Sequence, residues 1–350
     1  MSFYKPSFRH PDAAKNKLGL TLAPYEGPVS TLCAGCGHDS ISAAIVQAVW
    51  SLGVEPHRIA KMSGIGCSSK TPNYFLSNSH GFNSVHGRMP SVTTGATVSN
   101  HELMYIGVSG DGDTASIGMG QFSHVIRRNL NMMYIVENNG CYGLTKGQDS
   151  ATADEGSKSK KGRATQFEAI DLVALALDLG ATFVARSFSG DKEQLVPLMQ
   201  AAMSHKGFAL IDVISPCVTF NNHNGSTKSY DYTREHIEAG SVIDFVPFEK
   251  EINLKQSKGS TQKVELFNGS SINLSKLSDN YDPTSRRAAV TTLLDHKEDN
   301  KLLTGLIYLD PESENFHEML NISNTPLNEL EQETLCPGNA TLTDINASFK

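Results

Sequence analysis

The middle of the chain alternates short apolar segments with segments of helical spacing. Five apolar segments have the length and composition of buried strands: 59–63, 104–109, 132–137, 182–186 and 208–214. Helical spacing fits four intervening segments: 39–52, 115–128, 170–179 and 192–204. This alternation predicts an α/β fold, built as a doubly wound, mostly parallel sheet with helices on both faces.

Side chains that can bind metals or cofactors follow four of the predicted strands. Each of these residues stands just past a strand end: Cys67, Asp111, Asn139 and Cys217. In parallel sheets, ligands bind in the crevice outside the carboxyl ends of the strands. We therefore expect these residues, although distant in sequence, to face one crevice.

The composition argues against several classes of protein. The 350 residues are 39% hydrophobic and carry a formal net charge of -7, so they have no basic footprint for nucleic acid. The polar start resembles no secretory signal, and no run of about 18 apolar residues suits a membrane. We expect a cytoplasmic protein, in which six cysteines are metal ligands or free thiols rather than a disulfide framework.

The turn Gly110-Asp111-Gly112-Asp113 and the later Asn139 predict a site for a magnesium-bound diphosphate. The side-chain oxygens of Asp111 and Asn139 and the carbonyl of Cys141 are the hard ligands that magnesium prefers. The two glycines of the first turn let the main chain approach phosphates at a helix N-terminus. Either turn alone could simply connect a strand to a helix, whereas the pair indicates a cofactor site.

Four cysteines, Cys33, Cys36, Cys67 and Cys217, predict an iron–sulfur cluster. The first two have the spacing that lets two thiolates share a metal centre, and the fold must bring in the others. Structural zinc and a thioredoxin-like redox pair are the alternatives. Zinc ribbons usually carry two close pairs, so the single close pair favours iron–sulfur. Cys336, far out in the tail, is expected to be an unligated thiol.

Five motifs, in order, resemble those of the beta subunit of 2-oxoacid:ferredoxin oxidoreductases. They are Cys33-Ala34-Gly35-Cys36-Gly37-His38, Gly64-Ile65-Gly66-Cys67-Ser68-Ser69-Lys70, His86-Gly87-Arg88, Gly110-Asp111-Gly112-Asp113 and Tyr142-Gly143-Leu144-Thr145-Lys146-Gly147-Gln148. The resemblance runs from about residue 20 to about residue 245 and includes Cys217. Residues 303–308 and 325–328 resemble the longer beta subunits described as acting on 2-oxoglutarate.

The resemblance implies three cofactors: thiamine diphosphate, Mg²⁺ and one 4Fe-4S cluster. The implied cluster ligands are Cys33, Cys36, Cys67 and Cys217, and the implied magnesium ligands are Asp111, Asn139 and the backbone carbonyl of Cys141. The residues implied to bind thiamine diphosphate are Ile65, Gly66, Cys67, Ser68, His86, Gly110, Gly112, Asp113, Gly143 and Leu144. Lys70 is expected to be catalytic by meeting the substrate carboxylate, with a solvated surface lysine as the alternative.

The resemblance also implies a reaction and a partner. Such enzymes decarboxylate a 2-oxoacid oxidatively, pass the acyl group to coenzyme A and the electrons to ferredoxin, and can run in reverse as CO₂-fixing synthases. The glutamate that activates the coenzyme comes from an alpha subunit, so we expect a dimer of alpha–beta pairs, a heterotetramer. The expected substrate is 2-oxoglutarate, with pyruvate or a branched-chain 2-oxoacid as alternatives. A non-oxidative thiamine enzyme and an electron-transfer subunit are rivals of other classes.

Three parts are expected along the chain: an N-terminal arm at 1–30, a thiamine diphosphate and iron–sulfur binding domain at 31–230, and a C-terminal extension at 231–350. The extension loses the strand–helix rhythm and is expected to pack on the core or on the partner subunit. Its segment 251–274 has the composition of a hairpin or a loosely ordered stretch. The Lys- and Ser-rich loop 149–163 is expected either to meet substrate or coenzyme A phosphates or to be a solvated loop.

Overall fold

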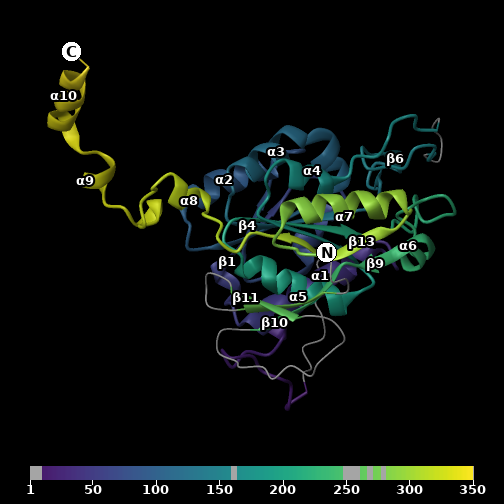
Figure 1. Ribbon diagram of the computed structural model, residues 1–350. Coiled ribbons are helices and arrows are strands. Elements are labelled where there is room, and N and C mark those ends of the chain that lie inside the picture. The colour runs from purple at the N-terminus through teal and green to yellow at the C-terminus, as the bar shows by residue number, and fades with distance from the viewer. Residues whose placement is uncertain (1–9, 159–163, 247–260, 266–270, 277–280, 350) are drawn as a thin grey trace.

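The fold is built around one eight-stranded sheet (Figure 1). The computed structural model describes residues 10–158, 164–246, 261–265, 271–276 and 281–349. The strand order is β2-β1-β3-β4-β8-β7-β13-β9. The strands are β1 (Ile59–Ser63), β2 (His80–Asn83), β3 (Met104–Gly110), β4 (Met132–Asn138), β7 (Phe183–Phe188), β8 (Phe208–Ile214), β9 (Ile237–Ala239) and β13 (Leu302–Leu309).

Six of these strands pair in parallel, from β2 through β7, and β13 then joins β7 in the antiparallel sense. The central strands β4 and β8 are buried along their whole length, as near-continuous apolar runs in a two-sided parallel sheet should be. The register pairs Gly110 with Glu137 and Asn138 with Ile214. The carboxyl ends of β3, β4 and β8 therefore lie side by side at one edge of the sheet.

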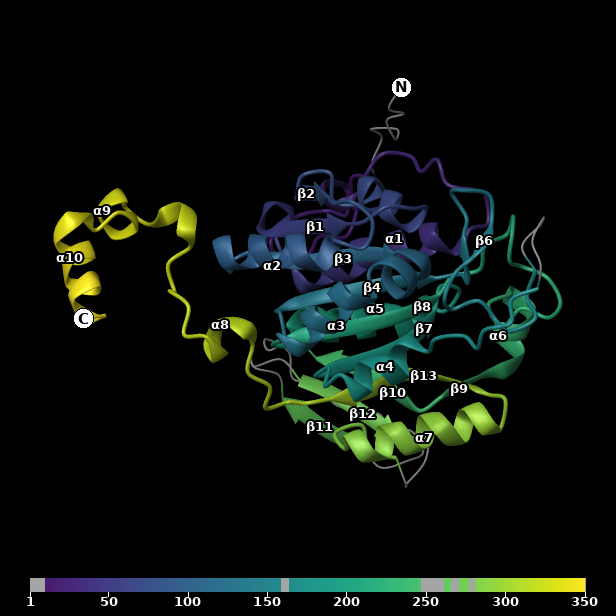
Figure 2. The ribbon, with the colours of Figure 1, turned by 90° about the horizontal axis from the view of Figure 1, so that it is seen from above.

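Helices cover both faces of the sheet (Figures 1 and 2). On one face lie α1 (Gly37–Leu52) and α5 (Lys192–Ser204). On the other lie α2 (Met89–Ser99), α3 (Met119–Arg127), α4 (Leu172–Asp178) and α7 (Arg286–Glu298). The doubly wound α/β architecture expected from the alternating pattern is therefore confirmed.

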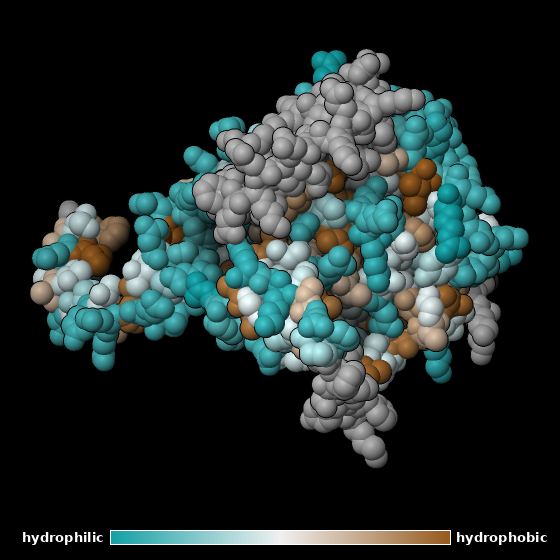
Figure 3. Space-filling view, turned by 90° about the horizontal axis from the view of Figure 1, so that it is seen from below, coloured by the Kyte–Doolittle hydropathy of each residue, from teal (hydrophilic) through white to brown (hydrophobic). Residues whose placement is uncertain are grey.

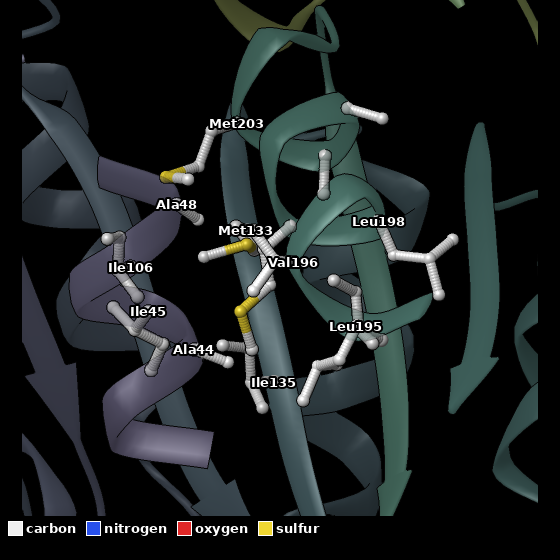
Figure 4. Packing of buried hydrophobic residues seen from close by; sticks show 14 of the residues in the cluster. Ala44, Ile45, Ala48, Ile106, Met133, Ile135, Leu195, Val196, Leu198 and Met203 are labelled. Carbon is white, nitrogen blue, oxygen red and sulfur yellow. The ribbon is translucent and has the colours of Figure 1, made fainter. Parts of the chain in front are cut away.

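The core between α1, α5 and the sheet is made of interlocking aliphatic side chains (Figure 4). Ala44 and Ile45 of α1 approach Leu195 of α5 above Ile135 of β4, and all four are fully buried. Complete burial of one such aliphatic side chain stabilises the fold by roughly 1.5–3 kcal/mol. This packing holds the turn that precedes α1 against the edge where the strands end.

Smaller elements surround the sheet. A three-stranded antiparallel sheet, β10 (Ser241–Val246), β12 (Ser271–Lys276) and β11 (Thr261–Glu265), contacts α5 through β10. A short hairpin joins β5 (Cys141–Tyr142) to β6 (Gln148–Asp149), and α6 (Tyr230–His236) precedes β9. Short helical turns lie at Ala23–Tyr25, Pro56–Arg58, Ser68–Tyr74 (η3), Gly112–Ile117 (η4) and Leu327–Glu329.

The C-terminal tail leaves the body after α8 (Phe316–Met319) and carries α9 (Gln332–Leu335) and α10 (Gly338–Ser348) (Figures 1 and 2). Apolar side chains lie exposed on it, among them Leu342 and Ile345, and the projecting tail shows hydrophobic patches in Figure 3. No helix in the described part of the chain combines the length and the apolar character needed to cross a bilayer.

Most elements match the sequence-based expectations. The segments predicted at 59–63, 192–204 and 208–214 coincide with β1, α5 and β8. The helix predicted at 115–128 is interrupted, because the Gly118 amide donates to the Asp113 carbonyl in a π-type turn before α3 begins.

The C-terminal region contributes strands to the main sheet and to the three-stranded sheet. The boundary expected at residue 230 does not coincide with the edge of the sheet, because β9 and β13 both lie in the main sheet. The hairpin expected at 251–274 corresponds in part to β11 and β12, which pair antiparallel. Residues 247–260 and 266–270 lie outside the described residues. The division into three domains stays a prediction.

Candidate functional site

A pocket lies where β1, β3 and β4 end. It is lined by Ile65, Gly66, Cys67, Ser68, His86, Gly110, Asp111, Gly112, Asp113, Asn139, Cys141, Tyr142, Gly143, Leu144 and Thr145. Every residue expected to bind thiamine diphosphate or magnesium is in this set. The fold thus brings separate turns to one place, as the strand ends predicted. The volume of the pocket is about 50 Å³.

Two glycines make room for the main chain in this pocket. A Cβ atom on Gly110 would lie 2.7 Å from the hydroxyl oxygen of Ser68, and one on Gly112 would lie 2.5 Å from the ring of Tyr142. Tyr142 also donates from its hydroxyl to the carbonyl of Gly112 at 3.0 Å. Sequence reasoning left Tyr142 out of the site, although it begins the motif that contains Gly143.

Asp111 and Asn139 are joined directly. Asp111 Oδ1 accepts a hydrogen bond from the backbone N–H of Asn139 at 3.2 Å. Asn139 Oδ1 accepts one from the backbone N–H of Cys141 at 3.0 Å. Asp111 Oδ2 accepts from the hydroxyls of Thr152, at 2.8 Å, and Ser150. Burial raises the pKa of Asp111, and these hydrogen bonds oppose the rise. A carboxylate, an amide oxygen and a nearby main-chain carbonyl are a donor set that fits Mg²⁺.

The start of the Lys- and Ser-rich loop is anchored at the same place. Ser150 and Thr152 are the residues that bond to Asp111, and Asp154 pairs with Lys228 at 3.5 Å. The basic residues Lys160, Lys161 and Arg163 lie outside the described residues. The role expected for this loop at phosphates therefore stays a prediction.

The carboxylate of Asp113 accepts hydrogen bonds from neighbouring protein groups. Its Oδ1 accepts from His86 Nδ1 and from the Gly87 amide, both at 2.9 Å. Its Oδ2 accepts from the Ser109 hydroxyl at 2.9 Å. Sequence reasoning assigned Asp113 to the coenzyme through its backbone, and it did not foresee these side-chain contacts.

Of the four predicted cluster cysteines, Cys67 and Cys217 lie together beside the pocket, and Cys33 and Cys36 lie in the turn before α1. The Cys36 amide donates to the Cys33 carbonyl at 3.0 Å in the turn before α1. A Cβ atom on Gly143 would lie 3.4 Å from the sulfur of Cys67 and 3.7 Å from that of Cys217. These two sulfurs, from different strand ends, therefore flank one glycine.

The charges of the cysteines act on one another. Burial raises the pKa of Cys36 to about 12, with smaller contributions from Cys217 and Cys67. Cys67 also interacts with Cys33. A hydrogen bond with the Cys141 thiol lowers the pKa of Cys217 to about 6.

Among the described residues, no three or more His, Cys, Asp or Glu side chains form a site for a single metal ion. Cys336 is exposed in the tail.

Lys70 lies in η3, beside the pocket and outside its lining. Its Nζ donates to the Thr31 hydroxyl over a long 3.4 Å. The Lys70 ammonium is close enough to act on Cys67 and lower the pKa of that thiol, although burial keeps the pKa raised overall. The ammonium is thus near both the cysteines and the segment that lines the pocket.

A buried acid and a buried histidine lie behind the cysteines. Glu137 and His38 are both fully buried, and His38 Nδ1 lies 2.7 Å from the Ser215 hydroxyl and 3.3 Å from Glu137 Oε2. Burial raises the pKa of Glu137 well above its usual range and lowers that of His38 to about 4. Sequence reasoning missed this pair, although a glutamate inside an apolar strand is a signal that could have been read.

A larger cavity, of about 310 Å³, lies farther along the same sheet edge. Arg186 on its wall pairs with Asp171 and, at 3.2 Å, with Asp212. These charges satisfy one another inside the protein. None of the residues expected to bind a cofactor, a metal or the substrate lines this cavity.

Two family models match the chain. One is described as the thiamine pyrophosphate enzyme, C-terminal TPP binding domain, and covers residues 64–213. The other describes the C-terminal part of the beta subunit of pyruvate ferredoxin oxidoreductase and covers residues 270–324. The first model spans every residue that lines the pocket.

Curated relatives and a solved structure agree with these models. The 2-oxoacid:ferredoxin oxidoreductase subunit beta of Sulfolobus sp is 40% identical over 248 residues, which are 70% of this chain and 80% of the relative. The 2-oxoglutarate synthase subunit KorB of Methanocaldococcus jannaschii is 33% identical over 238 residues, 68% of this chain and 83% of the relative.

The solved structure is a 2-oxoglutarate:ferredoxin oxidoreductase from Magnetococcus marinus with 2-oxoglutarate, coenzyme A and succinyl-CoA bound. It superposes with a TM-score of 0.70 and 29% identity, covering 86% of this chain and 89% of that one. Fold, pocket and relatives confirm the family resemblance read from the motifs. The chain belongs to the beta subunits of the thiamine-diphosphate-dependent 2-oxoacid:ferredoxin oxidoreductases.

Proposed function

We propose that this chain, together with an alpha subunit, oxidises 2-oxoglutarate to succinyl-CoA and CO₂, with coenzyme A as the acyl acceptor and ferredoxin as the electron acceptor. One observation carries the proposal: Cys67 lines the coenzyme pocket, and its sulfur flanks Gly143 together with Cys217. A residue that borders both the coenzyme and the iron–sulfur cluster gives electrons a short path from one to the other.

The proposed magnesium ligands are Asp111, Asn139 and the Cys141 carbonyl, and the support is their oxygen donor set. The glycine cradle supports the binding of the diphosphate against the main chain, since side chains at Gly110 and Gly112 would collide with their neighbours. When bound, thiamine diphosphate supplies an electron sink for decarboxylation. The role of the chain is to hold and orient it.

The proposed ligands of one 4Fe-4S cluster are Cys33, Cys36, Cys67 and Cys217. A cluster is held by four thiolates around a body larger than a single ion, so its ligands need not converge on one point. The support is that Cys67 and Cys217 lie together at Gly143 beside the pocket, and that Thr219, two residues after Cys217, contacts the Cys33 sulfur at 3.7 Å. The Cys141 thiol, which makes a hydrogen bond with Cys217, would lie next to this cluster.

Lys70 is proposed to orient the carboxylate of the 2-oxoacid. Lys70 follows Cys67 by three residues, and its ammonium makes a long contact of 3.4 Å with the Thr31 hydroxyl. Exchange of that contact for a substrate carboxylate would favour binding at the mouth of the pocket. A fixed positive charge there offsets the charge of the anionic substrate and aligns its 2-oxo group.

The partner and the substrate are supported by the relatives. The names of several relatives specify beta subunits and 2-oxoglutarate. The pocket of about 50 Å³ is smaller than the usual ligand pocket of roughly 300–1,000 Å³, which supports a site completed by a second chain. We propose a dimer of alpha–beta pairs. A cytoplasmic location stays a prediction from the sequence.

The test is anaerobic co-purification with the alpha subunit, followed by a panel of 2-oxoacids with coenzyme A and a viologen dye. We expect acid-labile sulfide, bound thiamine diphosphate and the highest kcat/KM with 2-oxoglutarate. If pyruvate greatly outperforms 2-oxoglutarate, the substrate assignment is wrong while the oxidoreductase assignment stands. Absence of both sulfide and 2-oxoacid-dependent dye reduction would contradict the proposed function itself.

A further inference from the structure

Three separate segments meet at the carboxylate of Asp113. The residue is 3% exposed, and its two oxygens accept hydrogen bonds from His86, Gly87 and Ser109, each at 2.9 Å. These donors come from the strand β3 and from the turn before α2. The carboxylate therefore ties the wall of the pocket to the edge of the sheet.

Glycines leave the space that this carboxylate fills. A Cβ atom on Gly64 would lie 1.8 Å from Asp113 Oδ2, so a side chain there would expel the carboxylate. A Cβ atom on Gly87 would lie 2.7 Å from the Cα of Gly118. The close approach of Gly64 and the three hydrogen-bond donors hold the buried Asp113 carboxylate in place. The contact with His86 is correspondingly fixed.

The contact determines how His86 faces the pocket. The His86 side chain is 47% exposed and lines the pocket. A carboxylate only accepts hydrogen bonds, so Nδ1 must carry the proton that it donates to Asp113. The ring is then held with Nε2, its other nitrogen, turned away from Asp113. In metal and catalytic sites, carboxylates commonly set the orientation and the tautomer of a histidine in this way.

We propose that Asp113 is a positioning residue, which fixes the ring of His86 so that Nε2 meets a polar group of the bound thiamine diphosphate. The inference rests on the proposed function, because it requires the coenzyme to bind in this pocket. It assigns the second aspartate of Gly110-Asp111-Gly112-Asp113 a task different from that of the first. Asp111 serves the metal, whereas Asp113 acts on the coenzyme through His86.

A purely architectural role for Asp113 makes a different prediction. If Asp113 only braces the turn at Gly87 and Ser109, its replacement should affect coenzyme binding independently of His86. If Asp113 acts through His86, the loss of coenzyme affinity on replacing Asp113 should not add to the loss on replacing His86. The variants are Asp113→Asn, which removes the charge while keeping the size, His86→Ala, and the double variant.

The measurement is the dissociation constant of thiamine diphosphate, obtained by calorimetry with Mg²⁺ on the alpha–beta complex stripped of coenzyme. We expect each single variant to bind thiamine diphosphate on the order of 10-fold more weakly. A loss of this size is typical when a residue that orients a binding side chain is replaced. The double variant should bind no more weakly than His86→Ala. An unchanged constant in Asp113→Asn, or losses that multiply in the double variant, would overturn the positioning role.

Two substitutions at the half-exposed His86 test the role of Nε2 while the buried carboxylate of Asp113 itself is kept. The amide nitrogen of glutamine reaches about as far as Nε2, whereas that of asparagine reaches only about as far as Nδ1. We therefore expect His86→Gln to retain more coenzyme affinity than His86→Asn. Equal affinity in the two variants would contradict a role for Nε2.

His317→Ala is the matched control, since His317 bonds to the Thr97 carbonyl at 3.0 Å outside the pocket. Its coenzyme affinity should equal that of the unmodified complex. Failure of the inference and failure of the proposed function give different results. If the unmodified complex binds no thiamine diphosphate, the proposed function fails; if it binds normally and His86→Ala does too, only this inference fails.

Discussion

At the scale of single residues, Cys67 joins the two proposed centres. It stands past the end of β1, lines the coenzyme pocket, and has its sulfur, like that of Cys217, close to Gly143. Gly143 has no side chain to separate them. Individual cysteines should therefore differ sharply in their importance, according to whether the fold brings them to this point.

Replacement of Cys217 by Ser should remove or strongly destabilise the cluster, because one of four thiolate ligands is lost. Acid-labile sulfide, visible absorbance and the electron paramagnetic resonance of the reduced complex measure the loss. Cys336→Ser is the matched control, since Cys336 is exposed in the tail, and it should keep a full cluster. Equal cluster content in the two variants would refute the ligand assignment.

Replacement of Lys70 by Met should raise the KM for 2-oxoglutarate, because the substrate carboxylate loses its cationic partner. A charge-assisted hydrogen bond contributes roughly 1.5–3 kcal/mol, which corresponds to about a 10- to 100-fold change in kcat/KM. Steady-state kinetics of the alpha–beta complex check this. Lys192, exposed at the start of α5, gives the control Lys192→Met, whose KM should not change.

At the scale of elements, β1 and η3 are held together by a buried lysine. Lys61 of β1 is 7% exposed, and its Nζ donates to the carbonyls of Pro72, Phe75 and Leu76 at 2.7, 2.8 and 3.0 Å. Burial lowers the pKa of Lys61 to about 8. One ammonium thus donates hydrogen bonds to all three carbonyls. These bonds attach η3 and the two residues after it to the sheet.

Replacement of Lys61 by Met should destabilise the complex, because three buried carbonyls lose their donor. Each unsatisfied buried group costs about 1–3 kcal/mol, so a total loss of at least about 3 kcal/mol is expected. Denaturant unfolding followed by circular dichroism measures it. The exposed Lys192→Met should lie within about 0.5 kcal/mol of the unmodified complex, and an equally small effect at Lys61 would contradict the proposed fastening.

At the scale of the whole molecule, a buried histidine links the sheet to the chain that follows β13. His205 is 4% exposed, and its Nε2 lies 2.9 Å from the Thr182 hydroxyl and 3.5 Å from that of Ser313. Burial lowers the pKa of His205 to about 3. Unfolding frees the imidazole to bind a proton at its ordinary pKa of about 6.5.

This difference predicts acid sensitivity. Since the folded-state pKa is depressed, the stabilisation is fully present above about pH 6.5 and is lost as the pH falls toward 3, by up to about 1.4 kcal/mol per pH unit. His205→Gln, which cannot titrate, should show a shallower decline in unfolding free energy between pH 6.5 and pH 5. Parallel pH profiles for the two proteins would contradict this assignment.

Much of the fold and of the candidate site was predictable from the sequence. The strands β1 and β8 and the helix α5 are marked by local apolar patterns, and parallel strands necessarily bring their carboxyl ends to one edge. The prediction failed where a hydrogen bond to a residue just before the predicted segment changed the local winding of the helix. The helix expected at 115–128 is interrupted at Gly118, because the Gly118 amide donates to the Asp113 carbonyl in a π-type turn.

The amino-acid sequence by itself determined the alternating elements, the residues that follow each strand and the family to which the motifs belong, because periodicity and motif spacing are local properties of a chain. The tertiary structure alone decided that β9 and β13 join the main sheet, that Asp113 bonds to His86 and that Glu137 lies buried beside His38. These contacts depend on packing between segments far apart in sequence, and no local pattern encodes that packing.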